Sequence, residues 1–316
     1  MKPFGAKLLV WVLVAVLLAA LLAGCGGKSG QQQPQQQQPS STEAKKPGKV
    51  VVGSKQFAEQ YILGYMIAEL LKAKTDLEVD DSLVGMGATE LLHPAMLKGQ
   101  LDLYPEYTGT GLMVVLKEQM ISDKQAAYDK VKSEYEKQFK IIWLPPFGFE
   151  DTFAIGVRAE TAQKLGLETL SDLAKRPELV FMGDETTWTR PDQYPGLQKV
   201  YGFNNKVKKT MDINLKYEAL AKGEVDIIPG FSTEGNLKKY NVKVMKDDKQ
   251  FFPPYDAAIV IRQETLEKYP QVGEVLKPLF GSITEADMIE LNYQVEVEKK
   301  EPLEVAKSFL KKRGLI

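Results

Sequence analysis

A proline motif that occurs twice constrains the fold of this chain more than any other feature. The sequence LPPF at 144–147 precedes the apolar run TFAI at 152–155, and FPPY at 252–255 precedes AAIV at 257–260. Because the two copies bracket one block of about a hundred residues, we predict that they mark two hinge strands. The middle block would then be inserted into a domain made from both chain ends. The spacing alone leaves open that these are two unrelated proline turns.

Short β-like runs alternate with helical segments through the rest of the folded part. The run over 49–53 is typical of a buried strand, and apolar residues at three- and four-residue spacing over 61–70 indicate an amphipathic helix. Further strands are expected over 77–84, 101–104, 154–157, 180–182, 207–211 and 225–228, with helices over 88–97, 195–201, 215–222 and most of 264–314. Strands separated by helices predict right-handed crossovers and a largely parallel sheet.

The first residues predict that the protein is exported and anchored to the membrane by a lipid. Lys2 and Lys7 precede an apolar run over 8–23, which suits a signal-peptide core and falls short of the roughly twenty residues of a membrane-spanning helix. The run ends in LAGC at 22–25, the pattern of a lipoprotein cleavage site, and Cys25 is the only cysteine in the sequence. We therefore expect acylation of Cys25, with diacylation as a stable membrane anchor. A buried thiol, the alternative, fits poorly between flanking glycines.

Composition divides the remaining chain into a tether and a folded part. The segment 25–48 is rich in Gly, Gln, Pro, Ser and Lys and is expected to be disordered. The folded part from 49 onward is long enough for two modest cores. The expected division is a signal peptide over 1–24, a tether over 25–48, a first lobe over 49–151 and 256–316, and a second lobe over 152–255. A formal net charge of −1 argues against a nucleic-acid partner, and we expect a monomer.

Six motifs in a fixed order carry a family resemblance. They are GSKQFAEQ at 53–60, DLYPEYTGTG at 102–111, RPD at 190–192 with PGL and YGF after it, GEVD at 223–226, FSTEG at 231–235 and FFPPYD at 251–256. Together they resemble the glycine betaine, choline and carnitine substrate-binding proteins of ABC transporters, over essentially 49–316. The resemblance implies an α/β, type II periplasmic-binding-protein fold, with two lobes, two hinge strands and a ligand cleft between the lobes. It also implies a permease and ATPase subunits as partners, and neither catalysis nor a cofactor.

The resemblance further implies an aromatic box for a trimethylammonium group. Position by position, the box would contain Tyr107, Phe153, Phe231 and Tyr255. Aromatic faces suit a cation that has no N–H to donate and no proton to lose. Arg190 is the implied partner of a ligand carboxylate, with Thr110 and the Ser54-Lys55-Gln56 turn as further donors. Family members commonly carry tyrosine where this chain has Phe153 and Phe231, which leaves recognition of the other end of the ligand open.

The sequence leaves several alternatives open. Arg190 favours a zwitterion of the glycine betaine type, while a choline- or carnitine-preferring protein stays possible. A lipid-anchored enzyme or ligand sensor could use the same scaffold, since a fold does not determine a function. His93 is the only histidine and lacks obvious catalytic or metal-binding partners, and no spacing singles out a carboxylate pair for acid/base chemistry.

Overall fold

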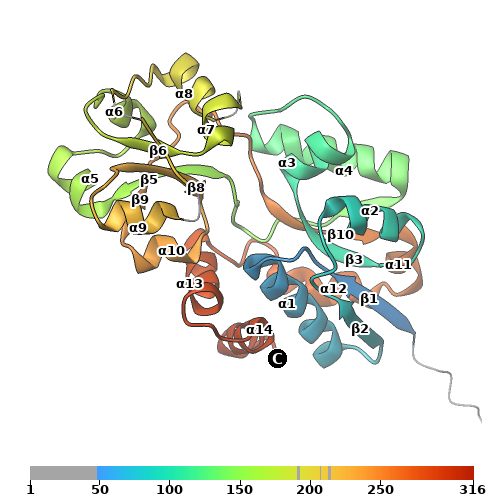
Figure 1. The fold of residues 1–316 in the computed structure, drawn as a ribbon. Helices are drawn as coiled ribbons and strands as arrows, with labels where there is room; N and C mark the ends of the chain where they lie inside the picture. Colours follow the sequence, from blue (N-terminus) through green and yellow to red (C-terminus); the bar gives the residue numbers. More distant parts are fainter. Residues whose placement is uncertain (1–47, 191–192, 207, 213–214) are drawn as a thin grey trace, which may run out of the picture. The chain divides into compact units, whose positions relative to one another are not determined.

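The computed structural model describes residues 48–190, 193–206, 208–212 and 215–316. The expected signal peptide, Cys25 and nearly all of the tether lie outside these ranges, as do Pro191 and Asp192. Two five-stranded sheets organise the described residues (Figure 1).

The first sheet draws its strands from both ends of the folded chain. Its strands are β1 (Lys49–Gly53), β2 (Glu78–Leu83), β3 (Leu103–Tyr107), β4 (Ile141–Trp143) and β10 (Ala257–Arg262). They lie in the order β2-β1-β3-β10-β4. The pairs β1–β2 and β1–β3 are parallel, whereas β10 runs antiparallel to both β3 and β4.

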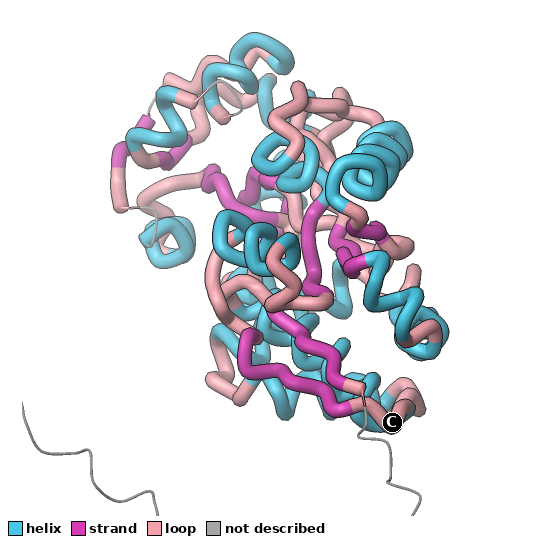
Figure 2. Tube along the Cα trace, turned by 90° about the vertical axis from the view of Figure 1, so that its right-hand side faces the viewer, coloured by secondary structure: helices cyan, strands magenta, loops and turns pink. Residues whose placement is uncertain are grey.

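Helices cover both faces of this sheet (Figure 2). They are α1 (Ala58–Lys74), α2 (Thr89–Leu97), α3 (Thr108–Thr110), η1 (Gly111–Val115), α4 (Lys124–Phe139), α11 (Gln263–Lys268), α12 (Gln271–Leu276), η3 (Lys277–Leu279), α13 (Glu285–Glu296) and α14 (Pro302–Lys312). Side chains alternate along β10, so that Ile259 packs with α1 and α14 in one core and Val260 packs with α2 and α4 in another. Burial on both faces explains the continuous apolar sequence of this strand.

The second sheet repeats the same plan. Its strands are β5 (Phe153–Arg158), β6 (Phe181–Gly183), β7 (Lys208–Thr210), β8 (Ile227–Phe231) and β9 (Val242–Val244), in the order β7-β6-β8-β5-β9. Its helices are α5 (Ala159–Leu165), α6 (Leu170–Ala174), α7 (Glu185–Thr189), α8 (Tyr194–Tyr201), α9 (Lys216–Ala221) and α10 (Gly235–Lys239). Here β6 pairs in parallel with β7 and β8, while β5 runs antiparallel to β8 and β9.

The expected alternation of strands and helices is confirmed. Each sheet is also largely parallel, as expected, because four of its five strands run in the same direction; the exceptions are β10 in the first sheet and β5 in the second. Both sheets are mixed, because β5 and β10 each follow a passage of the chain from one sheet to the other and enter antiparallel to their neighbours. Two strands also lie later than expected, at Leu103–Tyr107 and Ile227–Phe231. The first continues through Pro105, which occupies a register position opposite Ile259.

Two segments run side by side where the chain passes between the sheets. Glu150 and Asp256 form an antiparallel bridge, and the Asp151 N–H donates to the Tyr255 carbonyl at 3.1 Å. The Thr152 hydroxyl donates to the Pro253 carbonyl at 2.8 Å. The second proline motif therefore contacts the outgoing segment directly.

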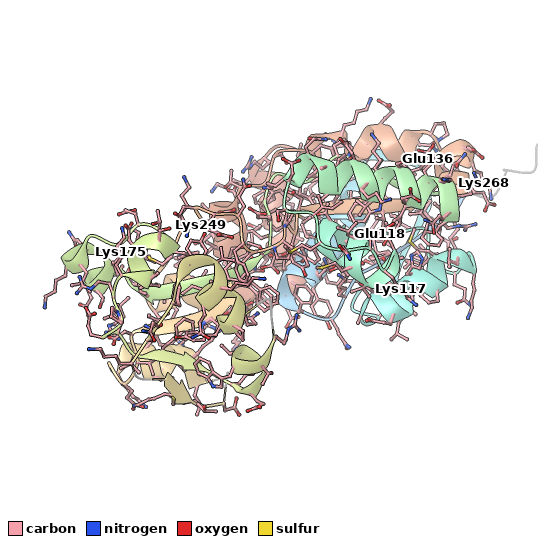
Figure 3. The ribbon with its side chains drawn as sticks, turned by 90° about the horizontal axis from the view of Figure 1, so that it is seen from above. Lys117, Glu118, Glu136, Lys175, Lys249 and Lys268 are labelled. Atoms are coloured by element: carbon pink, nitrogen blue, oxygen red, sulfur yellow. The ribbon has the colours of Figure 1, made fainter. Side chains whose placement is uncertain are left out.

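Charges of both signs are distributed over the exposed surface of the described residues. Figure 3 labels six of them, which are Lys117, Glu118, Glu136, Lys175, Lys249 and Lys268. Along the described ranges, none of the helices combines the length and the apolar character that crossing a membrane requires.

Candidate ligand-binding site

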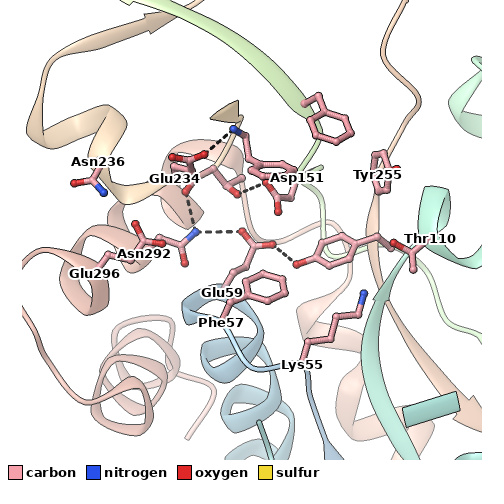
Figure 4. A pocket seen from close by; sticks show the side chains of 14 residues that line it. Lys55, Phe57, Glu59, Thr110, Asp151, Glu234, Asn236, Tyr255, Asn292 and Glu296 are labelled. Atoms are coloured by element: carbon pink, nitrogen blue, oxygen red, sulfur yellow. Dashed lines mark hydrogen bonds between the residues drawn. The ribbon is translucent and has the colours of Figure 1, made fainter. Parts of the chain in front are cut away.

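A cavity of about 560 Å³ lies where loops of the two sheets meet. This volume is in the range of roughly 300–1,000 Å³ that is usual for small-molecule sites. The first part of its lining comes from the loop between β1 and α1 (Lys55 and Phe57), from α1 (Glu59), from the end of β3 (Tyr107) and from α3 (Thr110). The rest comes from the passage segments (Asp151 and Tyr255), from β5, β8 and the loop after β8 (Phe153, Phe231, Thr233 and Glu234), from α10 (Asn236) and from α13 (Asn292 and Glu296) (Figure 4).

Three rings from three segments form an aromatic cluster, consisting of Phe153, Phe231 and Tyr255. Phe153 begins β5, Phe231 ends β8, and the two residues are direct cross-strand partners. Their rings stack with centroids 5.0 Å apart, and the Tyr255 ring meets Phe153 edge-on at 6.3 Å. Phe231 is 42% exposed although it is large and apolar. An exposed ring at the mouth of a cavity is available to a ligand.

Gly109 allows α3 to approach the aromatic cluster. A Cβ atom at this position would lie 2.7 Å from a ring carbon of Tyr255 and 2.9 Å from the Pro254 carbonyl oxygen. Any larger residue would displace the Tyr255 ring. This contact gives a physical reason for glycine at the center of the YTGTG sequence.

Tyr107 lines the cavity in a different setting. It is 4% exposed, and its hydroxyl donates to Glu59 Oε1 at 2.6 Å. The Lys55 ammonium lies 4.7 Å from the center of the Tyr107 ring, and the Phe57 ring stacks beside it at 6.4 Å. The ring of Tyr107 thus already has a cation close to it, supplied by the protein.

Glu106 fixes the position of this lysine. The Glu106 side chain is fully buried, and its carboxylate forms an ion pair with Lys55. It also accepts hydrogen bonds from the Thr89 hydroxyl at 2.7 Å, the Tyr104 hydroxyl at 3.1 Å and the Tyr107 N–H at 2.8 Å. Four donors converge on one buried carboxylate, which accounts for the glutamate of the 102–111 motif.

A further part of the cavity lining, here called the acidic floor, consists of the carboxylates of Glu59 and Asp151 and the amide of Asn292. Asn292 donates through Nδ2 to Glu59 Oε2 at 3.2 Å and to the Thr233 carbonyl at 2.8 Å. The Thr233 hydroxyl donates to Asp151 Oδ1 at 2.8 Å. Burial, followed by the nearby Asp151 carboxylate, raises the pKa of Glu59, and burial raises the pKa of Asp151.

These raised pKa values predict a pH-dependent stability. A carboxyl group whose pKa is higher in the folded than in the unfolded protein binds its proton more tightly when folded, so its contribution to the free energy of unfolding falls as the pH rises between the two values. We expect urea denaturation to show a loss of stability from about pH 4 to about pH 8, the range between the ordinary and the raised pKa values of the two groups, and a smaller loss in Glu59→Gln. Equal losses in the two proteins would contradict this assignment.

Two residues expected at the site lie apart from the cavity lining. Gln56 is exposed and, among the described residues, does not belong to the lining. Arg190 is also exposed, and its guanidinium carbon lies 5.9 Å from the center of the Phe153 ring. Arg190 is therefore next to the aromatic cluster rather than inside the described cavity. The other six expected residues, Lys55, Tyr107, Thr110, Phe153, Phe231 and Tyr255, all line it.

Several other lining residues were not among those expected from the sequence. Phe57 and Glu59 lie inside the 53–60 motif, and Thr233 and Glu234 lie inside the 231–235 motif, so their positions offered a signal. Asn292 has no comparable signal, because α13 carries it to the cavity from a segment more than two hundred residues after Glu59.

A family model described as "Substrate binding domain of ABC-type glycine betaine transport system" matches residues 48–312, which include nearly all of the described chain. The chain belongs to this family. A solved structure entitled "Crystal structure of glycine betaine/carnitine/choline ABC transporter" is 35% identical with a TM-score of 0.78, over 85% of this chain and 99% of that one. The family and the paired sheets identify a two-lobed type II binding-protein fold. Members of the family are substrate-binding proteins of transporters.

Two curated relatives extend the comparison. An ergothioneine transport permease/ergothioneine binding protein of Helicobacter pylori is 39% identical over 88% of this chain, and the chain spans only 49% of the length of that protein. A carnitine transport binding protein of Listeria monocytogenes is 36% identical over 83% of this chain and 86% of its own length.

Proposed function

We propose that this protein captures a quaternary-ammonium compound of the glycine betaine type and delivers it to an ABC permease and its ATPase subunits. The observation that carries the proposal is the aromatic cluster of Phe153, Phe231 and Tyr255 at the mouth of a cavity. A desolvated quaternary ammonium gains roughly 2 kcal/mol or more from a suitably placed ring. Ligand binding would favour a closed form, because a ligand shifts an equilibrium toward the state it binds better.

The proposal includes the cell location and the division into lobes. Acylation of Cys25 would hold the protein at the extracytoplasmic face of the membrane, with 25–48 as the tether. The first lobe would consist of 49–151 and 256–316, and the second of 152–255. The antiparallel bridge between Glu150 and Asp256 supports these limits, because it lies between the two sheets.

Calorimetric titration of residues 49–316 with glycine betaine and then choline tests the proposal. We expect saturable one-to-one binding of at least one of the two compounds. Heats that show no binding of either would contradict a quaternary-ammonium substrate. Turnover of either compound would instead favour the enzyme alternative.

Arg190 supplies a more specific prediction, because its guanidinium is next to the aromatic cluster. If closure brings Arg190 to the ligand carboxylate, Arg190→Ala should weaken glycine betaine binding by about ten-fold or more, as expected for a hydrogen bond between charged groups. Choline has no carboxylate and should be affected much less. Titration of both ligands checks this, with Arg176→Ala as a control that removes another arginine of the second lobe. Equal losses for the two ligands would remove Arg190 from this role.

A further inference from the structure

Each of the two sheets has a largely buried lysine–glutamate pair beside an aromatic residue of the cavity. In the first sheet the pair is Lys55 and Glu106, and the Tyr107 N–H donates to Glu106 at 2.8 Å. In the second sheet the pair is Lys216 and Glu234, whose side chains are 10% and 20% exposed and whose charged atoms lie 2.7 Å apart. The two glutamates occupy equivalent places, because each is bonded to an aromatic residue that ends a strand.

Glu234 accepts the same kinds of hydrogen bond as Glu106. It accepts from the Phe231 N–H at 2.9 Å and from the Tyr217 hydroxyl at 2.5 Å, in addition to its pairing with Lys216. Glu106 likewise accepts from a lysine, from a tyrosine hydroxyl and from the N–H of a strand-end aromatic residue. Because Glu106 precedes its aromatic residue whereas Glu234 follows its own, the two arrangements are alike in space and not in local sequence.

The Phe231 N–H requires an acceptor outside the β5–β8 ladder. In an antiparallel pair, the N–H groups of successive residues point alternately toward and away from the neighbouring strand. The next residue, Ser232, donates its N–H to the Thr152 carbonyl at 3.0 Å, so the Phe231 N–H points away from β5. Glu234 supplies the acceptor that this N–H requires.

The position of the Phe231 ring depends on its backbone more than on side-chain packing. The ring is 42% exposed, and it stacks on Phe153 at one face of the cluster. The Lys216–Glu234 pair lies against the preceding backbone, since a Cβ atom on Gly230 would be 3.0 Å from Glu234 Oε1 and 3.1 Å from Lys216 Nζ. A binding side chain with limited packing of its own is held in place by the hydrogen bonds around it.

From these contacts we infer that Glu234, held by Lys216 and Tyr217, is a positioning residue for the aromatic cluster. It fixes the backbone of Phe231 so that the ring faces the positive charge of the ligand. The inference rests on the proposed function and adds to it a group that acts through the ring. Because Glu234 also lines the cavity, the test separates this role from a direct attraction between its carboxylate and the ligand.

A double-mutant cycle, measured by calorimetric titration with choline, separates the two roles. Glu234→Ala should weaken binding at least about five-fold, which is part of the roughly thirty-fold loss expected when the ring itself is removed. In the Phe231→Ala background the same substitution should change the affinity by less than about two-fold, because no ring is left to position. Glu168→Ala breaks a pair with Lys243 in which the glutamate is 73% exposed, and it should leave the affinity unchanged.

Amide hydrogen exchange followed by NMR tests the positioning without a ligand. Loss of the acceptor in Glu234→Ala should speed exchange of the Phe231 N–H by about ten-fold or more. The Ser232 N–H keeps the Thr152 carbonyl as its acceptor and should keep its exchange rate. Glu234→Gln retains an oxygen for the Phe231 N–H, and should retain most of the protection and of the choline affinity.

Each outcome bears on a separate claim. A loss of affinity that persists in full in the Phe231→Ala background would overturn the inference, because Glu234 would then act on the ligand directly. Unchanged affinity, or unchanged exchange of the Phe231 N–H, in a folded Glu234→Ala protein would also overturn it. If that variant does not fold, Lys216→Met, which removes the other partner of the pair, takes its place in the cycle. Failure of the wild-type protein to bind choline, glycine betaine and tetramethylammonium would contradict the proposed function, and the exchange rates would still decide whether Glu234 fixes this backbone.

Discussion

Glu106→Ala should lower the free energy of unfolding by about 3–5 kcal/mol, the usual cost of breaking a buried ion pair by removing one partner. The substitution leaves the Lys55 ammonium without its carboxylate in a position where only 10% of its side chain is exposed. It also removes the acceptor for the Thr89 and Tyr104 hydroxyls. Urea denaturation followed by circular dichroism measures the change.

Two control variants distinguish the effect of the buried ion pair on the free energy of unfolding from the effect of removing any carboxylate. Glu274→Ala breaks a pair with Lys277 in which both side chains are more than half exposed, and it should change stability by about 0.5 kcal/mol or less. The double variant Lys55→Met/Glu106→Leu should be more stable than Glu106→Ala, because it leaves no charge buried alone. A Glu106→Ala protein as stable as Glu274→Ala would contradict this account of the buried pair.

Phe231→Ala should weaken the binding of a trimethylammonium ligand by roughly thirty-fold, which corresponds to about 2 kcal/mol for a desolvated ring against the cation. The substitution removes the ring that stacks on Phe153 at 5.0 Å. Because Phe231 is 42% exposed, its loss should affect folding little, and the affinity change can be attributed to the site. Phe231→Tyr retains the ring face and should retain most of the affinity. Titration with choline measures all three proteins.

Leu91→Ala is the matched control for this variant. Leu91 is another exposed apolar residue, at 53%, and it lies on α2 outside the cavity lining. Its removal should leave choline affinity unchanged. Loss of affinity in both variants would indicate a general effect on the protein, and unchanged affinity in Phe231→Ala would exclude that ring from ligand recognition.

The sequence predicted the order of most elements because apolar residues recur at the spacing that buried strands and helices require. The apolar run over 257–260 becomes the buried strand β10, and the three- and four-residue spacing over 61–70 becomes α1. The apolar pattern of a strand does not indicate whether it runs parallel or antiparallel to its neighbours. β10 is antiparallel to β3 because of the path that the chain takes from the second sheet, and no local pattern in either strand records that path.

The aromatic rings of the site were predictable, as were Lys55 and Thr110, but the carboxylates of the lining and Asn292 were not. Phe153, Phe231 and Tyr255 lie in recognisable motifs at strand ends, and the structure places all three at one cavity. Asn292 reaches the same cavity only through the packing of α13 against α1 and α10. Its role depends on hydrogen bonds with Glu59 and Thr233, residues far from it in sequence. Arg190 was expected in the site on the basis of its motif, and it lies beside the aromatic cluster instead.

If the aromatic rings recognise the positive charge of a quaternary ammonium group, removing that charge from the ligand should weaken binding. Choline and its neutral carbon isostere, in which carbon replaces the nitrogen, share their shape and hydroxyl and differ in the charge. We expect saturable binding of choline in calorimetric titration and at least about ten-fold weaker binding of the isostere. Equal affinities would mean that the rings provide only an apolar surface and do not recognise the cation.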